Sequence, residues 1–186
     1  MLTHTYIFDR YSDAKEAVSA LEASKISPAF ISLVGRGGDD LMSLHAYAPG
    51  EQIAPVNPSG LLDALGLMVI PGAGPLAVGG WLAAGIAARG TTGQAVVETL
   101  QAAGHSASDA ETLAEALHRG ASVVAVRANA TRSAEVQALL TGAGGVDPEK
   151  RGAAYRDNGW TGFDPDAKPY TSEEVFDERM RYRAAA

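Results

Sequence analysis

The chain has 186 residues, a net charge of −7 and no cysteine. This length is enough for one domain with a hydrophobic core and an appended segment. The acidic balance argues against nucleic-acid binding through phosphate neutralisation, and the lack of cysteine excludes disulfides, thiolate catalysis and cysteine-ligated zinc. No basic stretch followed by an apolar one opens the sequence, so we expect no signal peptide and a cytoplasmic protein.

The first 35 residues predict a β-α-β unit. Residues 5–8, TYIF, are typical of a short strand. Asp13 and Glu16 have the spacing of a capping box, and apolar residues then recur at helical intervals. A second strand is expected at residues 30–34, FISLV. The residues expected on the buried face of the helix are Ala14, Ala17, Val18 and Leu21.

A similar unit is expected near the C-terminal end. Residues 121–127, ASVVAVR, are β-branched and apolar enough for a central strand. Thr131 or Ser133 can cap a helix that ends at about Leu140, and residues 145–149 can supply a short edge strand. The two units together favour a ferredoxin-like βαβ–βαβ sheet, with four antiparallel strands and two helices on one face.

The fold class is therefore expected to be α/β, or α+β in stricter terms. We expect one domain over residues 1–150, interrupted at about residues 36–119 by a large, mostly helical insertion rich in Gly and Ala. Thr92 or Gly93 can open one helix of the insertion, and Ser108 with Glu111 forms a capping box for another.

The uncharged stretch 64–88 is the most unusual part of the insertion. Pro75 suits the first turn of a helix that runs to about Arg89. Small residues recur every four positions along this helix, and such a row lets two helices approach closely. We therefore expect self-association into a homo-oligomer, with a dimer favoured. The residues expected at the interface are Gly80, Trp81, Ala84 and Ala88.

Two alternatives remain for this stretch. It is long enough to cross a bilayer, but Pro71 and Pro75 divide it into parts that are each too short, and its flanking charges show no bias. Packing inside a soluble protein is favoured, and a membrane-associated protein that docks through residues 64–88 is the first alternative. A small-ligand-binding or enzymatic domain, with a pocket between sheet and insertion, is the second.

Composition changes after Lys150, and residues 151–186 are expected to form a C-terminal arm that ends in a charged helix. Thr171 and Glu174 have the spacing of a capping box for that helix. Because an arm with so little core of its own would fray, we expect it to dock on its own domain or on a neighbouring subunit. The expected anchors of the arm are Trp160, Phe163 and Tyr170, and the expected apolar stripe of the helix is Val175, Phe176, Met180 and Tyr182.

Three patterns could carry chemistry, and each has a better structural explanation. The GAGPLA segment at residues 72–77 mimics a dinucleotide-binding turn, but no strand with an acidic end follows it. The calcium-loop spacing near Asp164 is interrupted by Pro165 and Pro169. The histidines lack the spacing of a metal site; they are His4, His45, His105 and His118. We predict no catalytic, cofactor-binding or metal-binding residue.

Two stretches carry a resemblance to a known family. They are TYIFDRYSDAKEAVSALEASKISPAFISLVGR and GQAVVETLQAAGHSASDAETLAEALHRGASVVAVRA. The first resembles the opening of the bacterial heat-induced general stress proteins (the YflT-type domain), and the second is similar to their helix–helix–strand block. The resemblance covers most of the chain apart from the aromatic arm, and it implies a role in stress physiology, a Gly-rich helical hairpin and no reaction. The expected function is a non-enzymatic stress-response protein that acts through self-association.

Overall fold

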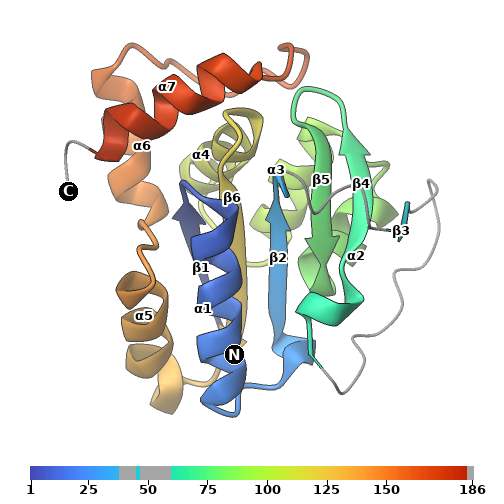
Figure 1. Cartoon of the computed structure of the whole chain (residues 1–186), viewed down its shortest axis with the longest axis vertical. Helices are drawn as coiled ribbons and strands as arrows, with labels where there is room; N and C mark the ends of the chain where they lie inside the picture. Colours follow the sequence, from blue (N-terminus) through green and yellow to red (C-terminus); the bar gives the residue numbers. More distant parts are fainter. Residues whose placement is uncertain (38–44, 47–59, 184–186) are drawn as a thin grey trace.

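The computed structural model describes residues 1–37, 45–46 and 60–183, which form a mixed α/β fold (Figure 1). Five strands make an antiparallel sheet in the order β1-β6-β2-β5-β4, and β3 adds a short parallel pair at the β4 edge. The strands are β1 (Leu2–Phe8), β2 (Ile31–Gly35), β3 (His45–Ala46), β4 (Gly66–Ile70), β5 (Gly74–Gly79) and β6 (Ser122–Ala128).

Helices connect and cover these strands. The α-helices are α1 (Tyr11–Ala23), α2 (Gly80–Ala88), α3 (Gly93–Ala102), α4 (Ala107–His118), α5 (Ser133–Gly142), α6 (Pro148–Asp157) and α7 (Ser172–Arg183). Short 3-10 helices lie at Pro28–Phe30, Leu62–Ala64 and Ala130–Arg132. In the described residues, none of these helices combines the length with the apolar character that crossing a bilayer requires.

The strand β6 is the centre of the fold. It runs antiparallel to both β1 and β2, so these two strands are parallel to each other and α1 makes the crossover between them. The prediction of a central strand at 121–127 is confirmed. Its continuous apolar run follows from burial on both faces, since a strand covered on both sides needs no polar face.

Helices pack on both faces of the sheet (Figure 1). Helices α1 and α5 pack on one face with Phe8, Leu33 and Val124, and the predicted buried row of α1 lies in this core. The insertion supplies α2, α3 and α4 to the other face, where Ile7 and Val123 lie. The expectation of two helices on one face therefore describes only half of the arrangement.

The helix expected from Pro75 to about Arg89 is present only from Gly80, as α2, and its first part is the strand β5. The stretch 64–88 contains β4, a tight turn, β5 and α2. Gly72 and Gly74 have φ values of +87° and +79°, which glycine adopts without the strain that a side chain would introduce. Pro75 lies in β5 beyond the part that pairs with β2, where a strand tolerates a residue without an N–H group.

Several predicted helix starts are shifted. Helix α1 begins after Arg10 without a side-chain cap, so the expected Asp13–Glu16 box is not formed. Ser106, rather than Ser108, caps α4, because its Oγ accepts the N–H of Asp109. The predicted caps at Thr92 and at Thr171 with Glu174 are confirmed. Thr92 accepts the N–H of Ala95, and Thr171 and Glu174 each accept the backbone N–H of the other.

The start of the arm differs from the prediction. The edge strand expected at 145–149 is reduced to one bridge between Val146 and Ile7, and α6 follows at once. Asp147 caps this helix and Pro148 occupies its first turn, a position that suits proline. Helix α7 then lies across the end of the sheet at which β1 and β2 end and β6 begins (Figure 1).

Candidate functional site

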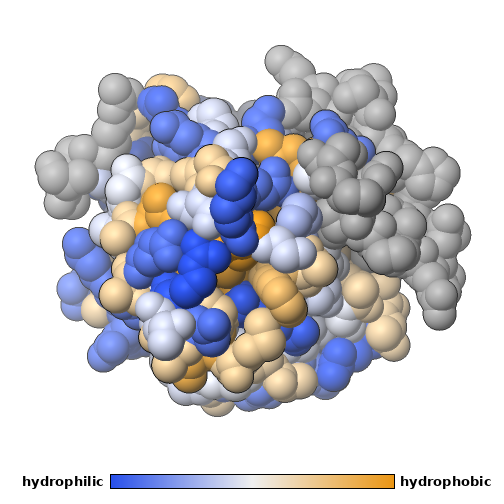
Figure 2. Space-filling view, turned by 90° about the horizontal axis from the view of Figure 1, so that it is seen from below, coloured by the Kyte–Doolittle hydropathy of each residue, from blue (hydrophilic) through white to orange (hydrophobic). Residues whose placement is uncertain are grey.

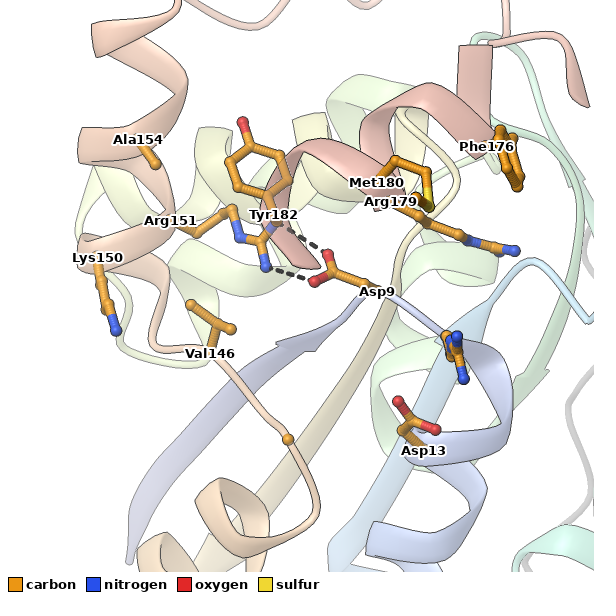
Figure 3. A pocket seen from close by; sticks show the side chains of 12 residues that line it. Asp9, Asp13, Val146, Lys150, Arg151, Ala154, Phe176, Arg179, Met180 and Tyr182 are labelled. Atoms are coloured by element: carbon orange, nitrogen blue, oxygen red, sulfur yellow. Dashed lines mark hydrogen bonds and ion pairs between the residues drawn. The ribbon is translucent and has the colours of Figure 1, made fainter. Parts of the chain in front are cut away.

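A cavity of about 570 Å³ opens beneath α7, at the end of the sheet where β1 leads into α1 (Figure 3). Its walls come from the β1–α1 junction, from the residues between α5 and α6, from α6 itself and from α7. Four basic and two acidic side chains line it, in a chain whose net charge is −7. The basic residues are Arg10, Lys150, Arg151 and Arg179, and the acidic ones are Asp9 and Asp13.

The first turn of α1 faces this cavity. Arg10 is its N-cap residue and has extended backbone geometry, but its side chain makes no cap hydrogen bond. The N-terminal end of a helix carries partial positive charge on its N–H groups, which favours nearby anions. The positive end of α1 therefore adds to the basic side chains around it.

Arg151 forms a fixed wall of the cavity. Its guanidinium binds the carboxylate of Asp9 through two contacts, Nη1 to Oδ1 at 2.9 Å and Nη2 to Oδ2 at 3.0 Å. It also lies over the ring of Tyr182 with its Cζ 4.1 Å from the ring centre. The side chain of Arg151 is 3% exposed, so its charge is already matched within the protein.

Arg179 stands in contrast because no carboxylate in the described residues pairs with it. Its buried Nε has no hydrogen-bond partner among the described residues, and its Nη2 reaches the Gly120 carbonyl at 3.5 Å. Burial is the main cause of a lowered pKa for Arg179. The charges of Arg10 and Arg36 also lower this pKa, whereas those of Asp9 and Asp13 raise it. The guanidinium remains charged at neutral pH. The cavity thus holds a half-buried cation that lacks an anion.

The outer wall of the cavity is apolar. Phe176 and Met180 project from successive turns of α7 and are 61% and 47% exposed. Val146 and Ala154 line the cavity from other elements. Of the stripe predicted for this helix, only Val175 is buried, and it packs against Gly120.

The arm residues singled out from the sequence lie on the chain's own domain. Trp160 is half-buried and meets the ring of Tyr155 edge-on, with 5.8 Å between centres. Phe163 packs so closely on Gly93 that a Cβ there would lie 2.9 Å from its Cζ. Tyr170 meets the ring of His118 at 5.1 Å.

A buried ionic cluster beneath α7 was not predicted. Arg119 donates to Glu115 through Nε at 2.6 Å and to Glu178 through Nη1 at 2.7 Å, and its guanidinium lies 4.2 Å from the Tyr155 ring centre. The i, i+4 spacing of Glu115 and Arg119 was the only local signal. Glu178 belongs to the charged helix expected at the end of the arm, yet it is only 7% exposed because it turns toward Arg119.

The residues expected at a self-association surface differ in their exposure. Gly80 packs against the backbone of Ile31 and Ser32, whereas Ala84 and Ala88 are exposed. Trp81 is half-buried, because the guanidinium of Arg127 lies 3.8 Å from its ring centre and its Nε1 donates to the Phe30 carbonyl. Figure 2 shows the end of the molecule opposite α7, where apolar residues are interspersed with hydrophilic ones.

The residues considered for metal and cofactor binding are separated. His4 bonds to Ser133, His105 to Thr5, and His118 to the Gly72 carbonyl at 2.6 Å, while the side chain of His45 lies outside the described part. In the described ranges no three His, Asp or Glu side chains form a group that could hold a metal ion. Residues 72–77 form the β4–β5 turn and the start of β5, not a strand-to-helix turn.

Comparisons with protein-family models, with curated proteins and with solved structures found no match to this chain.

Proposed function

We propose that the protein binds a small molecule with an anionic group and an apolar part, in the cavity beneath α7. The observation that carries this proposal is the half-buried Arg179, whose Nε has no partner and which no described carboxylate neutralises. A buried cation without a counter-charge is unfavourable, and charge-assisted hydrogen bonds to a bound anion would relieve this. Arg10 and the first turn of α1 are placed to assist.

The apolar part of the ligand would contact Phe176 and Met180. Both side chains are exposed at the cavity, so an apolar group bound against them would remove their surface from water. Their position on the wall opposite Val146 would enclose an alkyl or aryl group while the anionic group reaches Arg179. A carboxylate, sulfonate or phosphate on a hydrophobic body has this combination of properties.

The frame that supports the site is proposed to be ferredoxin-like at its core. The order β1-β6-β2, the crossover through α1 and the position of Val146 beside Ile7 support this, since Val146 occupies the place of a fourth strand. The insertion extends the same sheet through β5 and β4. In this interpretation the arm closes over the end of the sheet and completes the cavity.

The test uses anilinonaphthalene sulfonate, a fluorescent probe with an aromatic body and one anionic group. We expect binding by the native protein, displacement of the probe by dodecanoate and no displacement by dodecanol. Arg179→Gln is expected to weaken binding roughly 10- to 100-fold, as the loss of a charge-assisted hydrogen bond would. Arg89→Gln is the matched control, because Arg89 is exposed at the end of α2.

Three results would contradict this function. One is equal displacement by the acid and the alcohol, which would indicate a purely apolar site. A second is unchanged probe affinity in a folded Arg179→Gln variant, with the fold verified by circular dichroism. Weakened binding in the Arg89→Gln control as well would place the probe outside the cavity and would also contradict the proposal.

A second candidate function is self-association, with the stress-response role that the sequence resemblance implies. The observation in its favour is the exposed position of Ala84 and Ala88 on α2. Ala84→Leu should then lower the solution mass measured by light scattering at several concentrations, while Ala134→Leu on α5 should not. A monomeric native protein, or an oligomer unchanged by Ala84→Leu, would remove this candidate.

A further inference from the structure

The strand β1 has a free edge. It is the first strand of the sheet, and among the described residues only Ile7 is paired on its outer side, through its N–H and C=O to Val146. Successive residues of a strand direct these groups to opposite sides, so the backbones of Thr3 and Thr5 face the same way as that of Ile7. Within the described ranges, these backbone groups have no partner on the outer side.

A cavity of about 250 Å³ lies along this edge. Gln137 on α5 lines it on one face of the sheet, and His105 and Asp109 line it on the other. The start of α6, with Asp147 and Glu149, closes it at the end near Val146. The open edge is therefore a groove with defined walls rather than a flat surface.

The groove is acidic. Three carboxylates line it, those of Asp109, Asp147 and Glu149, and no Lys or Arg does. Asp109 accepts a hydrogen bond from Ser106, and Asp147 accepts the N–H of Glu149, but none of the three belongs to an ion pair in the part of the chain that the structure describes. His105 is neutral at neutral pH and does not offset these negative charges. Burial lowers its pKa, although the charges of Asp109 and Asp147 act to raise it.

We propose that this groove binds an extended, lysine- or arginine-rich peptide segment of another protein, which adds to the sheet as a strand beside β1. The unpaired N–H groups of Thr3 and Thr5 need hydrogen-bond acceptors, and their unpaired C=O groups need donors. An extended peptide carries both kinds of group on one side at every second residue, which matches the spacing of Thr3 and Thr5. Its basic side chains would meet the three carboxylates. The bridge at Val146 already occupies the first such position.

Charge complementarity selects this occupant over the others. A second copy of β1, with the sequence LTHTYIF, brings no Lys or Arg to the carboxylates. A metal ion lacks a cluster of ligands in the described residues, and it would leave the N–H groups unpaired. This site differs from the one beneath α7 in position and in the sign of its charge. The two proposals are therefore independent, and a negative result for one does not bear on the other.

The experiment uses an acetylated and amidated hexapeptide of alternating lysine and valine. Calorimetry should give measurable binding, and hydrogen exchange should show new protection at the amides of Thr3 and Thr5. A glutamate–valine hexapeptide and a version of the lysine peptide N-methylated at alternate amides should bind at least tenfold more weakly. Spermine should give no protection of the two amides.

Variants test the charge contribution. Asp109→Asn with Glu149→Gln should weaken binding of the lysine peptide about three- to tenfold, as the loss of two surface ion pairs would. Asp63→Asn with Glu98→Gln is the control, since both side chains are exposed away from the groove. Unchanged affinity for the N-methylated peptide, unprotected Thr3 and Thr5 amides, or an equal effect of the control pair would overturn the proposal.

Discussion

The stretch 64–88 and the segment 158–183 have opposite compositions, yet both pack on the same domain. The first has no charged side chain, and most of its large apolar residues are buried, Leu76, Leu82 and Ile86 fully. The second is highly charged, yet it contributes the exposed pair Phe176 and Met180. In this protein the uncharged stretch 64–88 contributes to the core. The exposed apolar side chains proposed to bind a ligand lie instead on the charged helix α7.

The two regions are also stabilised by different forces. Burial of apolar surface stabilises residues 64–88 by about 25 cal/mol per Å², an effect that depends little on salt or protonation. The arm depends on the Arg119–Glu178 ion pair and on a few contacts such as those of Val175. Segments with few apolar contacts open at lower free energy than the core, so we expect α7 to open before β5 and α2.

The largest expected effect is in the apolar region. Leu82→Ala removes a fully buried side chain of α2, and we expect a loss of about 2–5 kcal/mol in the free energy of unfolding, because a cavity remains. Urea denaturation measures this. Val69→Ala is the control, because Val69 is largely exposed on β4 and should change stability by less than about 0.5 kcal/mol. Equal losses in the two variants would contradict the assignment of this region to the core.

A smaller, more local effect is expected in the arm. Glu178→Gln removes the charge that binds Arg119 through Nη1 and should destabilise the attachment of α7 by roughly 1.5–3 kcal/mol. Hydrogen exchange should accelerate in α7 and remain unchanged in α2. The exposed neighbour Asp177→Asn is the matched control. If exchange accelerates equally in α2, then the arm and the core open as one unit, and the comparison of the two regions is wrong.

The βαβ units could be predicted because their signals are local. The buried row of α1 and the β-branched run of β6 are patterns within a few residues, and each lies where such a pattern places it. The segment Pro75–Gly79 was assigned to a helix because proline suits a first helical turn, whereas it belongs to β5. The left-handed residues Gly72 and Gly74 turn the chain from β4 into β5, and their φ values are not visible in the sequence.

The site was not predictable for a different reason. Its cavity depends on contacts between residues far apart in the sequence, such as Asp9 with Arg151 and Arg119 with Glu178. Each of these residues resembles an ordinary surface charge when only its neighbours are considered. Helix α6 was missed as well, since its charged and Gly-containing sequence has no clear apolar face.

The smallest expected effect is the acid sensitivity of the arm. The N–H and hydroxyl of Thr171 bind Glu174 Oε2 at 2.7 and 2.8 Å, and these bonds lower the pKa of Glu174 below its ordinary value of 4.5. A carboxylate with a lowered pKa contributes stability that is complete above pH 4.5 and is lost as the pH falls through its folded value. Backbone NMR shifts should therefore show the first turn of α7 fraying below pH 4.5 while α2 stays helical. Glu174→Gln should remove this pH dependence, and the control Glu173→Gln should preserve it. If α7 and α2 fray at the same pH, the capping box does not stabilise α7 independently of the core.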